Sequence, residues 1–347
     1  MILSGGPPSV LVRVIRDHVV ESVHRGHLVI VDEAGRVVAA LGDPEREIYA
    51  RSAVKPFQTL GSLDLLDHAG LALDTDGVAI ACASHSGSTL HQVEVARLLA
   101  LAGLDERALQ CPAALPWDLD TLLDQRIPTS LAHNCSGKHA GFLLATRAAR
   151  ADPAAYLRED TPVQRAVHAR LAEATTTEPR GPGVDGCGAP AWILPLRGLA
   201  AAFARLAAGG AAYARVRDAM LRRPHLIGGQ GRTDTTLMLD DHRVVAKAGA
   251  EAVLAVGFHS GRHGALGLAT KIEDGSGRAT GPVVATALRA LGGRVGDALI
   301  RPLVLGGGEP HGVVEPSPAI IARIRSAFGD ETAATKQQRR NERADHE

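Results

Sequence analysis

Short segments rich in Val, Ile, Leu and Ala lie at both ends of the chain and predict β-strands there. Residues 9–42 contain several of them, and Asp32-Glu33-Ala34-Gly35 within this region is typical of a hairpin turn. Three further segments, at 243–248, 252–258 and 265–272, are joined by short connections that contain glycine. This spacing predicts an antiparallel meander.

The middle of the chain carries apolar residues at helical spacing. Helices are predicted at about 52–68, 89–102, 136–150, 162–175, 194–208, 210–222 and 282–291.

The continuous apolar run 77–83 predicts a buried strand that delivers the polar loop 84–87. Strands at both ends with helices between them predict an α+β fold, an antiparallel sheet flanked by helices with a helical subdomain. We expect a single domain over 1–325, followed by a charged, disordered tail over 326–347.

Composition narrows the class of protein. The 347 residues include 38 Lys plus Arg and 38 Asp plus Glu, so the formal charge is zero and no nucleic-acid or membrane surface is indicated. No apolar run is long enough to span a membrane, and the N-terminus lacks the pattern of a secretory signal. Four cysteines are too few for a disulfide scaffold, so we expect a protein of the reducing cytoplasm.

Ser52 and Lys55 are the first candidates for chemistry. They follow the predicted short strand Ile48-Tyr49 and stand three residues apart at the start of a helix, where positions i and i+3 share one face. A lysine that loses its proton can activate a serine for attack on an acyl group. The alternative is a helix-capping serine followed by a solvated lysine.

A second serine and a second lysine stand at the ends of predicted strands. Ser84 cannot form a dyad with His85, because adjacent residues on a strand face opposite ways, so a lysine from elsewhere is the better partner. Lys271 ends the last strand of the meander. The alternatives are a turn serine and a surface lysine paired with Glu273 or Asp274.

Two cysteines and a lysine suggest a metal site. Cys135 precedes a predicted helix, whose N-terminus favours a thiolate, Lys138 follows it, and Cys187 lies in a glycine-rich loop. Two thiolates bind zinc strongly, whereas a lysine must first lose a proton. Two inert buried cysteines or a redox pair are the alternatives, and Asp185 is either a supporting residue of the site or a turn residue.

Six short motifs occur in one order along the chain: RSAVKPFQ (51–58), ASHSG (83–87), HNCSGKHAGF (133–142), DGCG (185–188), KAGAE (247–251) and KIEDG (271–275). Together they resemble the asparaginase II family, the rhizobial-type L-asparaginases. The resemblance implies a fold similar to that of serine β-lactamases and serine glutaminases. It also implies a homodimeric cytoplasmic amidohydrolase that acts on L-asparagine.

The resemblance also implies roles for individual residues. It pairs Ser52 with Lys55 and Ser84 with Lys271 as catalytic groups. A zinc ion would be held by Cys135, Lys138 and Cys187. Residues near the metal or the substrate are matched by Arg51, His139 and Asp185. The segment 247–252 departs from the family where glycine is expected, at Ala248 and Ala252.

The resulting hypothesis is hydrolysis of asparagine through a serine ester. Ser52 is the preferred nucleophile, Lys55 its base, and Ser84 with Lys271 a supporting relay. Backbone N–H groups at the start of the Ser52 helix would hold the oxyanion. The alternatives are a glutaminase or broader amidase, and a non-catalytic module that binds zinc or recognises penicillin.

Overall fold

The structure is a computed structural model that describes residues 6–329. Within them, eight strands form an antiparallel sheet, and β3 (Val37–Leu41) pairs only with β2. The other seven lie in the order β10 (Leu303–Gly306), β11 (Glu309–Pro316), β1 (Ser9–Arg16), β2 (Val19–Asp32), β9 (Gly264–Ile272), β8 (Val253–Ser260) and β7 (Val244–Gly249). Both ends of the chain therefore build one sheet, because β1 pairs with β11 (Val14 opposite Val314) and β2 with β9 (Val29 opposite Ala269).

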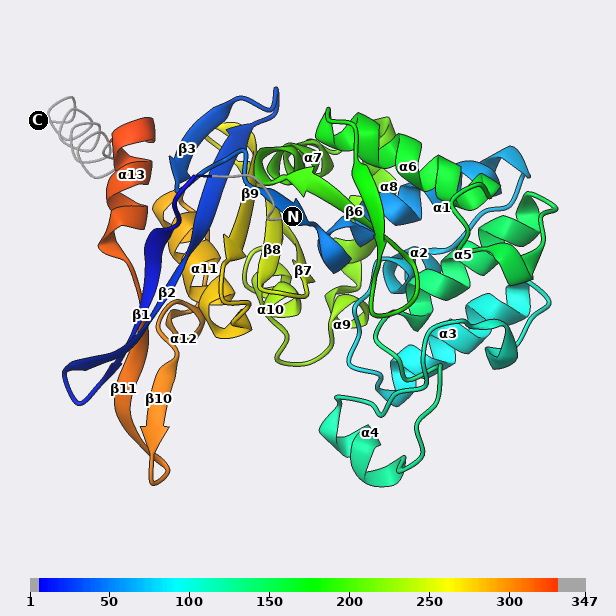
Figure 1. Ribbon diagram of the computed structural model, residues 1–347, viewed down its shortest axis with the longest axis horizontal. Helices are drawn as coiled ribbons and strands as arrows, with labels where there is room; N and C mark the ends of the chain where they lie inside the picture. The colour runs from blue at the N-terminus through cyan, green and yellow to red at the C-terminus, as the bar shows by residue number, and fades with distance from the viewer. Residues whose placement is uncertain (1–5, 330–347) are drawn as a thin grey trace, which may run out of the picture.

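Helices cover both faces of this sheet (Figure 1). On one face α7 (Leu196–Ala208) packs on β9, β8 and β2, and its many alanines let the helix lie close to the strands. On the other face lie α11 (Thr280–Ala290), α12 (Asp297–Ile300) and α13 (Pro318–Phe328). Covering both faces makes the central strands almost wholly apolar.

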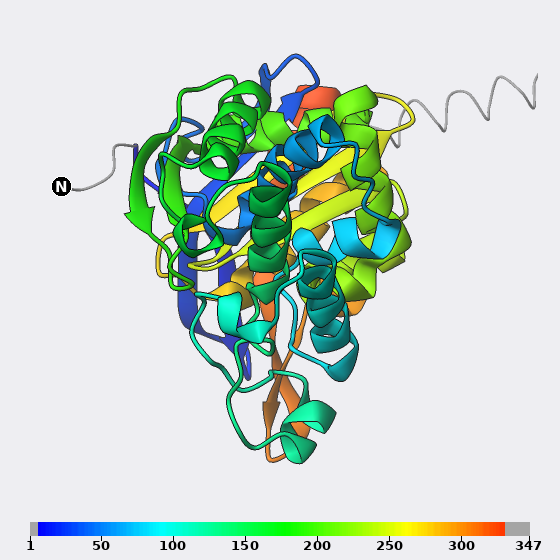
Figure 2. The same ribbon diagram turned by 90° about the vertical axis from the view of Figure 1, so that its right-hand side faces the viewer.

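The remaining helices form a second half of the molecule, beside the β7 edge of the sheet. This helical half faces the viewer in Figure 2. There α1 (Lys55–His68) packs against α5 (Ser136–Ala148) and α6 (Pro162–Thr175). The other helices are α2 (Thr75–Ala81), α3 (Thr89–Leu101), α4 (Leu119–Asp124), α8 (Ala211–Arg222), α9 (Pro224–Ile227) and α10 (Thr233–Asp240). A small sheet of β4 (Glu47–Tyr49), β6 (Pro190–Pro195) and β5 (Arg180–Val184) lies beside them.

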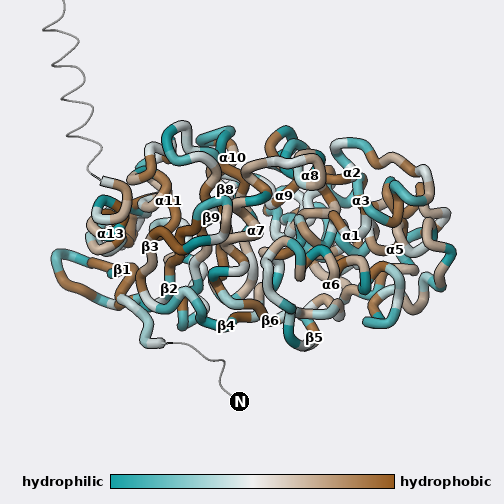
Figure 3. The backbone as a smooth tube through the Cα atoms, turned by 90° about the horizontal axis from the view of Figure 1, so that it is seen from above, coloured by the Kyte–Doolittle hydropathy of each residue, from teal (hydrophilic) through white to brown (hydrophobic). Residues whose placement is uncertain are grey.

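The hydrophobic core is continuous through both halves. Figure 3 shows hydrophobic stretches of backbone in the sheet half around β2 and β3. No helix within residues 6–329 has the length and apolar character needed to cross a membrane. All four cysteines are buried and free.

The predicted α+β class, the meander β7–β8–β9, the hairpin turn at 32–35 and the helical middle are confirmed. The predicted strand over 77–83 is wrong. Asp74 caps helix α2, its side chain accepting from Gly77 N, and residues 77–81 are apolar because this part of the helix is buried. The glycine-rich loop predicted around Cys187 is the short connection between β5, which ends at Val184, and β6, which begins at Pro190. Helix α13 extends through Phe328, past the predicted start of the tail, and residues 330–347 lie outside the described residues.

Candidate active site

The turn that carries Ser52 joins the small sheet to α1. Residues Arg51–Val54 form a 3₁₀ helix, and Lys55 N donates to Ser52 O as α1 begins. Ser52 is not a side-chain cap, and its partly buried hydroxyl makes no hydrogen bond to another described residue. Arg51 takes a left-handed φ of 50°, a conformation that non-glycine residues rarely adopt and that is common at functional sites.

Lys55 lies at the centre of the site, with 1% of its surface exposed. Its Nζ donates to Ala83 O at 2.5 Å and to Ser84 Oγ at 3.0 Å, and it lies 3.2 Å from Cys135 Sγ. With a longer contact to Asn134 O at 3.4 Å, four acceptors surround the three hydrogens that an ammonium would carry. A neutral amine in the same place has a lone pair that can accept the Ser84 proton.

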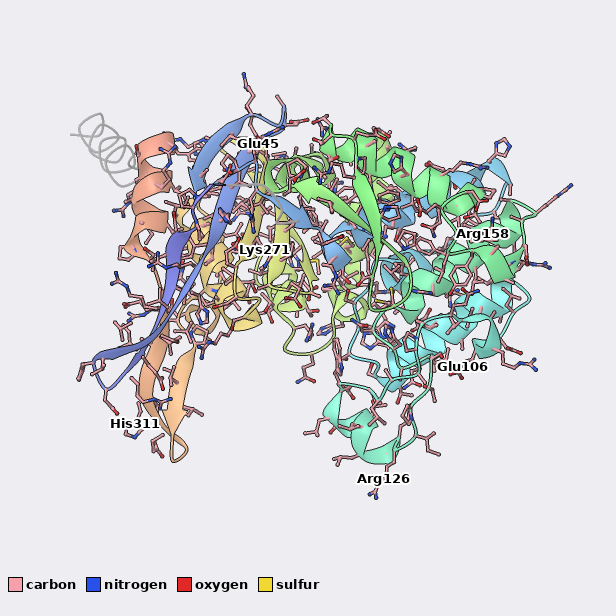
Figure 4. The ribbon with its side chains drawn as sticks, in the orientation of Figure 1. Glu45, Glu106, Arg126, Arg158, Lys271 and His311 are labelled. Carbon is pink, nitrogen blue, oxygen red and sulfur yellow. The ribbon has the colours of Figure 1, made fainter. Side chains whose placement is uncertain are left out.

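Ser84 is brought to Lys55 by the end of helix α2, and its N–H donates to Ile227 O at 2.8 Å. The predicted pairing of Ser84 with Lys271 is not formed: among the described residues, no hydrogen bond joins them. Lys271 Nζ donates to the backbone carbonyl of Glu251 at 2.8 Å and also to that of Ile272, and Figure 4 shows it over the sheet half. Lys271 lies within β9, opposite His27 of β2 and Val253 of β8, whereas Ser84 follows helix α2.

The amine that sequence reasoning missed is Lys247, which is fully buried on the edge strand β7. Its Nζ donates to Ala248 O at 2.7 Å and lies 3.2 Å from Asp234 Oδ2. Burial lowers the pKa of Lys247 to about 8 against the opposing effect of Asp234, and the charge of Lys55 acts in the lowering direction. The signal in the sequence was a lysine inside an otherwise apolar strand segment.

The close approach of β7 to the Ser52 turn depends on Gly249. A Cβ built on Gly249 would lie 3.1 Å from both Ala50 O and Ala53 N. The strand that carries Lys247 therefore lies directly against the turn that carries Ser52. Two serines and two lysines thus meet in one region, but the second lysine is Lys247 instead of Lys271.

A cluster of sulfur and nitrogen atoms borders this region. Lys138 Nζ donates to Cys187 Sγ at 3.1 Å, and Cys187 also hydrogen-bonds to Cys135. That thiol–thiol bond, helped by the charges of Lys55 and Lys138, holds the pKa of Cys135 well below its ordinary value. The same bond and burial raise the pKa of Cys187. Although burial opposes it, the two sulfurs raise the pKa of Lys138.

The three residues expected near substrate or metal lie around this cluster. Arg51 donates to Asp185 Oδ1 through Nε (3.1 Å) and Nη2 (2.9 Å), so its charge is already paired. His139 is fully buried, which lowers its pKa well below the ordinary value, and its Nδ1 lies 2.6 Å from Tyr156 Oη. Its Nε2 is a buried atom without a hydrogen-bond partner among the described residues.

The side chains around Cys135 could bind a metal ion only if the Lys138 amine is one of the ligands. Among residues 6–329, no group of three or more His, Cys, Asp and Glu side chains could hold an ion. Two buried sulfurs are nevertheless soft ligands of the kind zinc accepts, and the Lys138 nitrogen lies 3.1 Å from one of them, Cys187 Sγ. A zinc site at this place therefore depends on deprotonation of Lys138.

Comparison with known proteins places this geometry in context. Two solved structures are similar over part of their length, "Crystal Structure Analysis of Mglu" (16% identity, TM-score 0.33, 75% of this chain and 65% of that one) and "Crystal Structure Analysis of Mglu in its tris and glutamate form" (14%, 0.34, 82% and 61%). The chain thus spans less than two thirds of either. A search of curated proteins found no match. The family model described as L-asparaginase II matches residues 12–314, nearly the whole chain, and the protein therefore belongs to the L-asparaginase II family.

Proposed function

We propose that the protein hydrolyses the side-chain amide of L-asparagine to aspartate and ammonia through a serine ester. Family membership supports an amidohydrolase. The observation that carries the mechanism is the buried 3.0 Å hydrogen bond between Lys55 Nζ and Ser84 Oγ, beside the Ser52 turn. A serine and a lysine in contact can pass a proton, which serine chemistry requires.

In the proposed first half-reaction, Ser52 Oγ attacks the amide carbon, and its proton passes through Ser84 to the neutral amine of Lys55. Ser52 is assigned the attack because its hydroxyl is unpaired, whereas the Ser84 hydroxyl is already bound to Lys55. Backbone N–H groups of the 51–54 turn would hold the oxyanion. The C–N bond then breaks, and the proton on Lys55 leaves with ammonia.

In the second half-reaction, water attacks the aspartyl ester while Lys55 takes its proton through Ser84. The C–O bond breaks, the proton returns to Ser52, and aspartate leaves. Lys247 is proposed to assist by losing its own proton, which removes a positive charge beside Lys55.

Zinc is proposed as a resident ion held by Cys135, Lys138 and Cys187. When bound, it would supply a fixed positive charge that orients groups at the substrate's α-carbon. The chain's own residues perform the acyl transfer, so no proton transfer requires the metal.

The test is mass spectrometry of protein quenched during asparagine turnover, together with Ser52→Ala and Ser84→Ala. We expect an aspartyl adduct on Ser52, and a loss of several orders of magnitude in kcat for both variants with folding intact. An adduct on Ser84 would exchange the two roles. Turnover without any adduct would contradict the ester mechanism.

The same assay separates the alternative activities. Faster ammonia release from glutamine than from asparagine would indicate a glutaminase, because one methylene is worth only about 10- to 200-fold in discrimination. Stable acylation by a β-lactam without ammonia release from either amide would instead indicate a non-catalytic module.

A further inference from the structure

Arg232 is a partly buried cation with no carboxylate partner. Among the described residues, its guanidinium makes no ion pair and no side-chain hydrogen bond. Its guanidinium lies over the ring of Trp117, with Cζ 5.1 Å from the ring centroid. A stacked arginine is held in one orientation by the ring while its N–H groups stay available, an arrangement suited to binding an anion.

The backbone before Arg232 and the tryptophan under its guanidinium both contact the loop that carries Ser84. The segment before it packs against the Ser84–Ser86 loop: Ile227 O accepts from Ser84 N, and a Cβ on Gly229 would lie 2.4 Å from Ser86 Oγ. On the other side, Trp117 N donates to Ser86 O at 2.7 Å. The guanidinium therefore lies over a ring whose backbone is anchored two residues after Ser84.

Among the described residues, Arg232 forms no ion pair, whereas other cations of the site already have partners. Arg51 is neutralised by Asp185, and Lys247 is paired with Asp234. Lys55 is enclosed by the acceptors Ala83 O, Ser84 Oγ and Cys135 Sγ. The charge of Arg232 acts on Lys247 and Asp234, lowering the pKa of each, so the guanidinium lies within electrostatic reach of this buried pair.

We propose that Arg232, positioned by Trp117, binds the α-carboxylate of the substrate and so restricts the enzyme to free amino acids with a side-chain amide. This inference rests on the proposed function and adds the group that recognises the substrate. Asparagine within a peptide has no free α-carboxylate and would be excluded.

The test compares L-asparagine with 3-aminopropanamide, which is asparagine without its α-carboxylate and has a single amide. For the wild-type protein we expect kcat/KM to be about 10²-fold or more higher for asparagine, because the site's cation is left unpaired by the analogue. In Arg232→Gln, kcat/KM for asparagine should fall about 10²-fold, while that for 3-aminopropanamide changes less than about threefold. Arg232→Lys should recover part of the loss, since it keeps the charge but not the fork geometry.

Arg223→Gln is the matched control, because Arg223 is an exposed arginine nearby in sequence that is paired with Asp76. It should leave the ratio between the two substrates unchanged. An equal loss on both substrates in Arg232→Gln, or an unchanged ratio, would overturn the role of Arg232 while leaving the proposed hydrolysis standing. If the wild-type protein releases ammonia from no amide, the proposed function itself fails, and this inference with it.

Discussion

The primary amine of Lys247 is completely buried and faces the carboxylate of Asp234. Burial penalises the charged form of a lysine, and Asp234 only partly offsets the penalty, so the pKa falls to about 8. A group that titrates close to neutral pH within a proposed proton-transfer site is a candidate for the ionisation that controls rate.

We predict that kcat/KM rises with pH through about 8 and then levels, as Lys247 loses its proton. Asp234→Asn removes the carboxylate that raises this pKa, so the rising limb should move to lower pH. Asp218→Asn, at an exposed pair with Arg217, is the control and should leave the profile unchanged. An unshifted limb in Asp234→Asn would assign the ionisation to another group.

The same shift has a consequence for stability. The folded-state pKa of about 8 lies below the ordinary lysine value of about 10.4, so the unfolded chain binds more protons between these two pH values. The contribution of Lys247 to the free energy of unfolding therefore rises from pH 8 to pH 10 and is constant below that window.

Ala252 occupies the turn between β7 and β8 with a left-handed φ of 54°, at a position where the resemblance leads us to expect glycine. Left-handed backbone costs an alanine about 1–2 kcal/mol, partly offset by the lower entropy of its unfolded chain. We predict that Ala252→Gly raises the free energy of unfolding by about 0.5–1 kcal/mol, measured by urea denaturation. Ala250→Gly in the same turn, where φ is not positive, should lower it; equal effects would refute the strain.

Among the elements, the contact of α5 with α2 fixes the site most directly. Helix α5 carries Lys138 and has Cys135 as its N-cap, while α2 leads into Ser84. A Cβ on Gly137 would lie 2.2 Å from Ile80 O, so the two helices meet with no room for a side chain. The spacing between Lys55, Ser84 and Cys135 thus depends on a residue that performs no chemistry.

We predict that Gly137→Ala lowers the free energy of unfolding by about 3 kcal/mol and reduces activity, because α5 must move away from α2. Gly141→Ala, one turn along the same helix, is the matched control. Its Cβ would be 3.1 Å from Ala81 Cβ, and the better helix propensity of alanine offsets the crowding, so the change should stay within about 1 kcal/mol. Similar effects of the two substitutions in urea denaturation would contradict this account.

At the scale of the whole molecule, the proposed metal ligands join separate parts of the fold. Cys135 and Lys138 belong to the start of α5, and Cys187 to the connection between β5 and β6 of the small sheet. An ion bound by all three would tie the helical half to the small sheet, so its binding free energy would add to folding stability.

We predict about one zinc per chain in purified protein by elemental analysis, and a melting temperature that falls by several degrees when a chelator removes it. Cys135→Ser and Cys187→Ser should lose the metal, whereas Cys111→Ser, at another buried free cysteine, should retain it. Metal-free protein from zinc-replete cells would contradict the site. The homodimer and the cytoplasmic location implied by the resemblance stay predictions, to be checked by solution mass and cell fractionation.

The sequence by itself determined most of the local secondary structure and identified most of the candidate site residues. Alternating and helical apolar patterns located β1 to β3, the meander and most helices, because burial of one face imposes those periods locally. The motifs containing Ser52, Lys55, Ser84, Cys135, Lys138 and Cys187 were recognisable because each is contiguous or nearly so. Periodicity failed at 77–83, where a helix enclosed on all sides has no polar face to reveal its period.

Only the tertiary structure decided which partners meet. It brought Ser84 into contact with Lys55 and buried Lys247 beside Asp234. It also stacked Arg232 on Trp117, with no ion-pair partner among the described residues. These contacts join residues 29, 13 and 115 positions apart. The physical reason is that the packing of distant segments sets the distance between side chains, the burial of an amine and hence its pKa, and none of these is encoded in the spacing of residues along the chain.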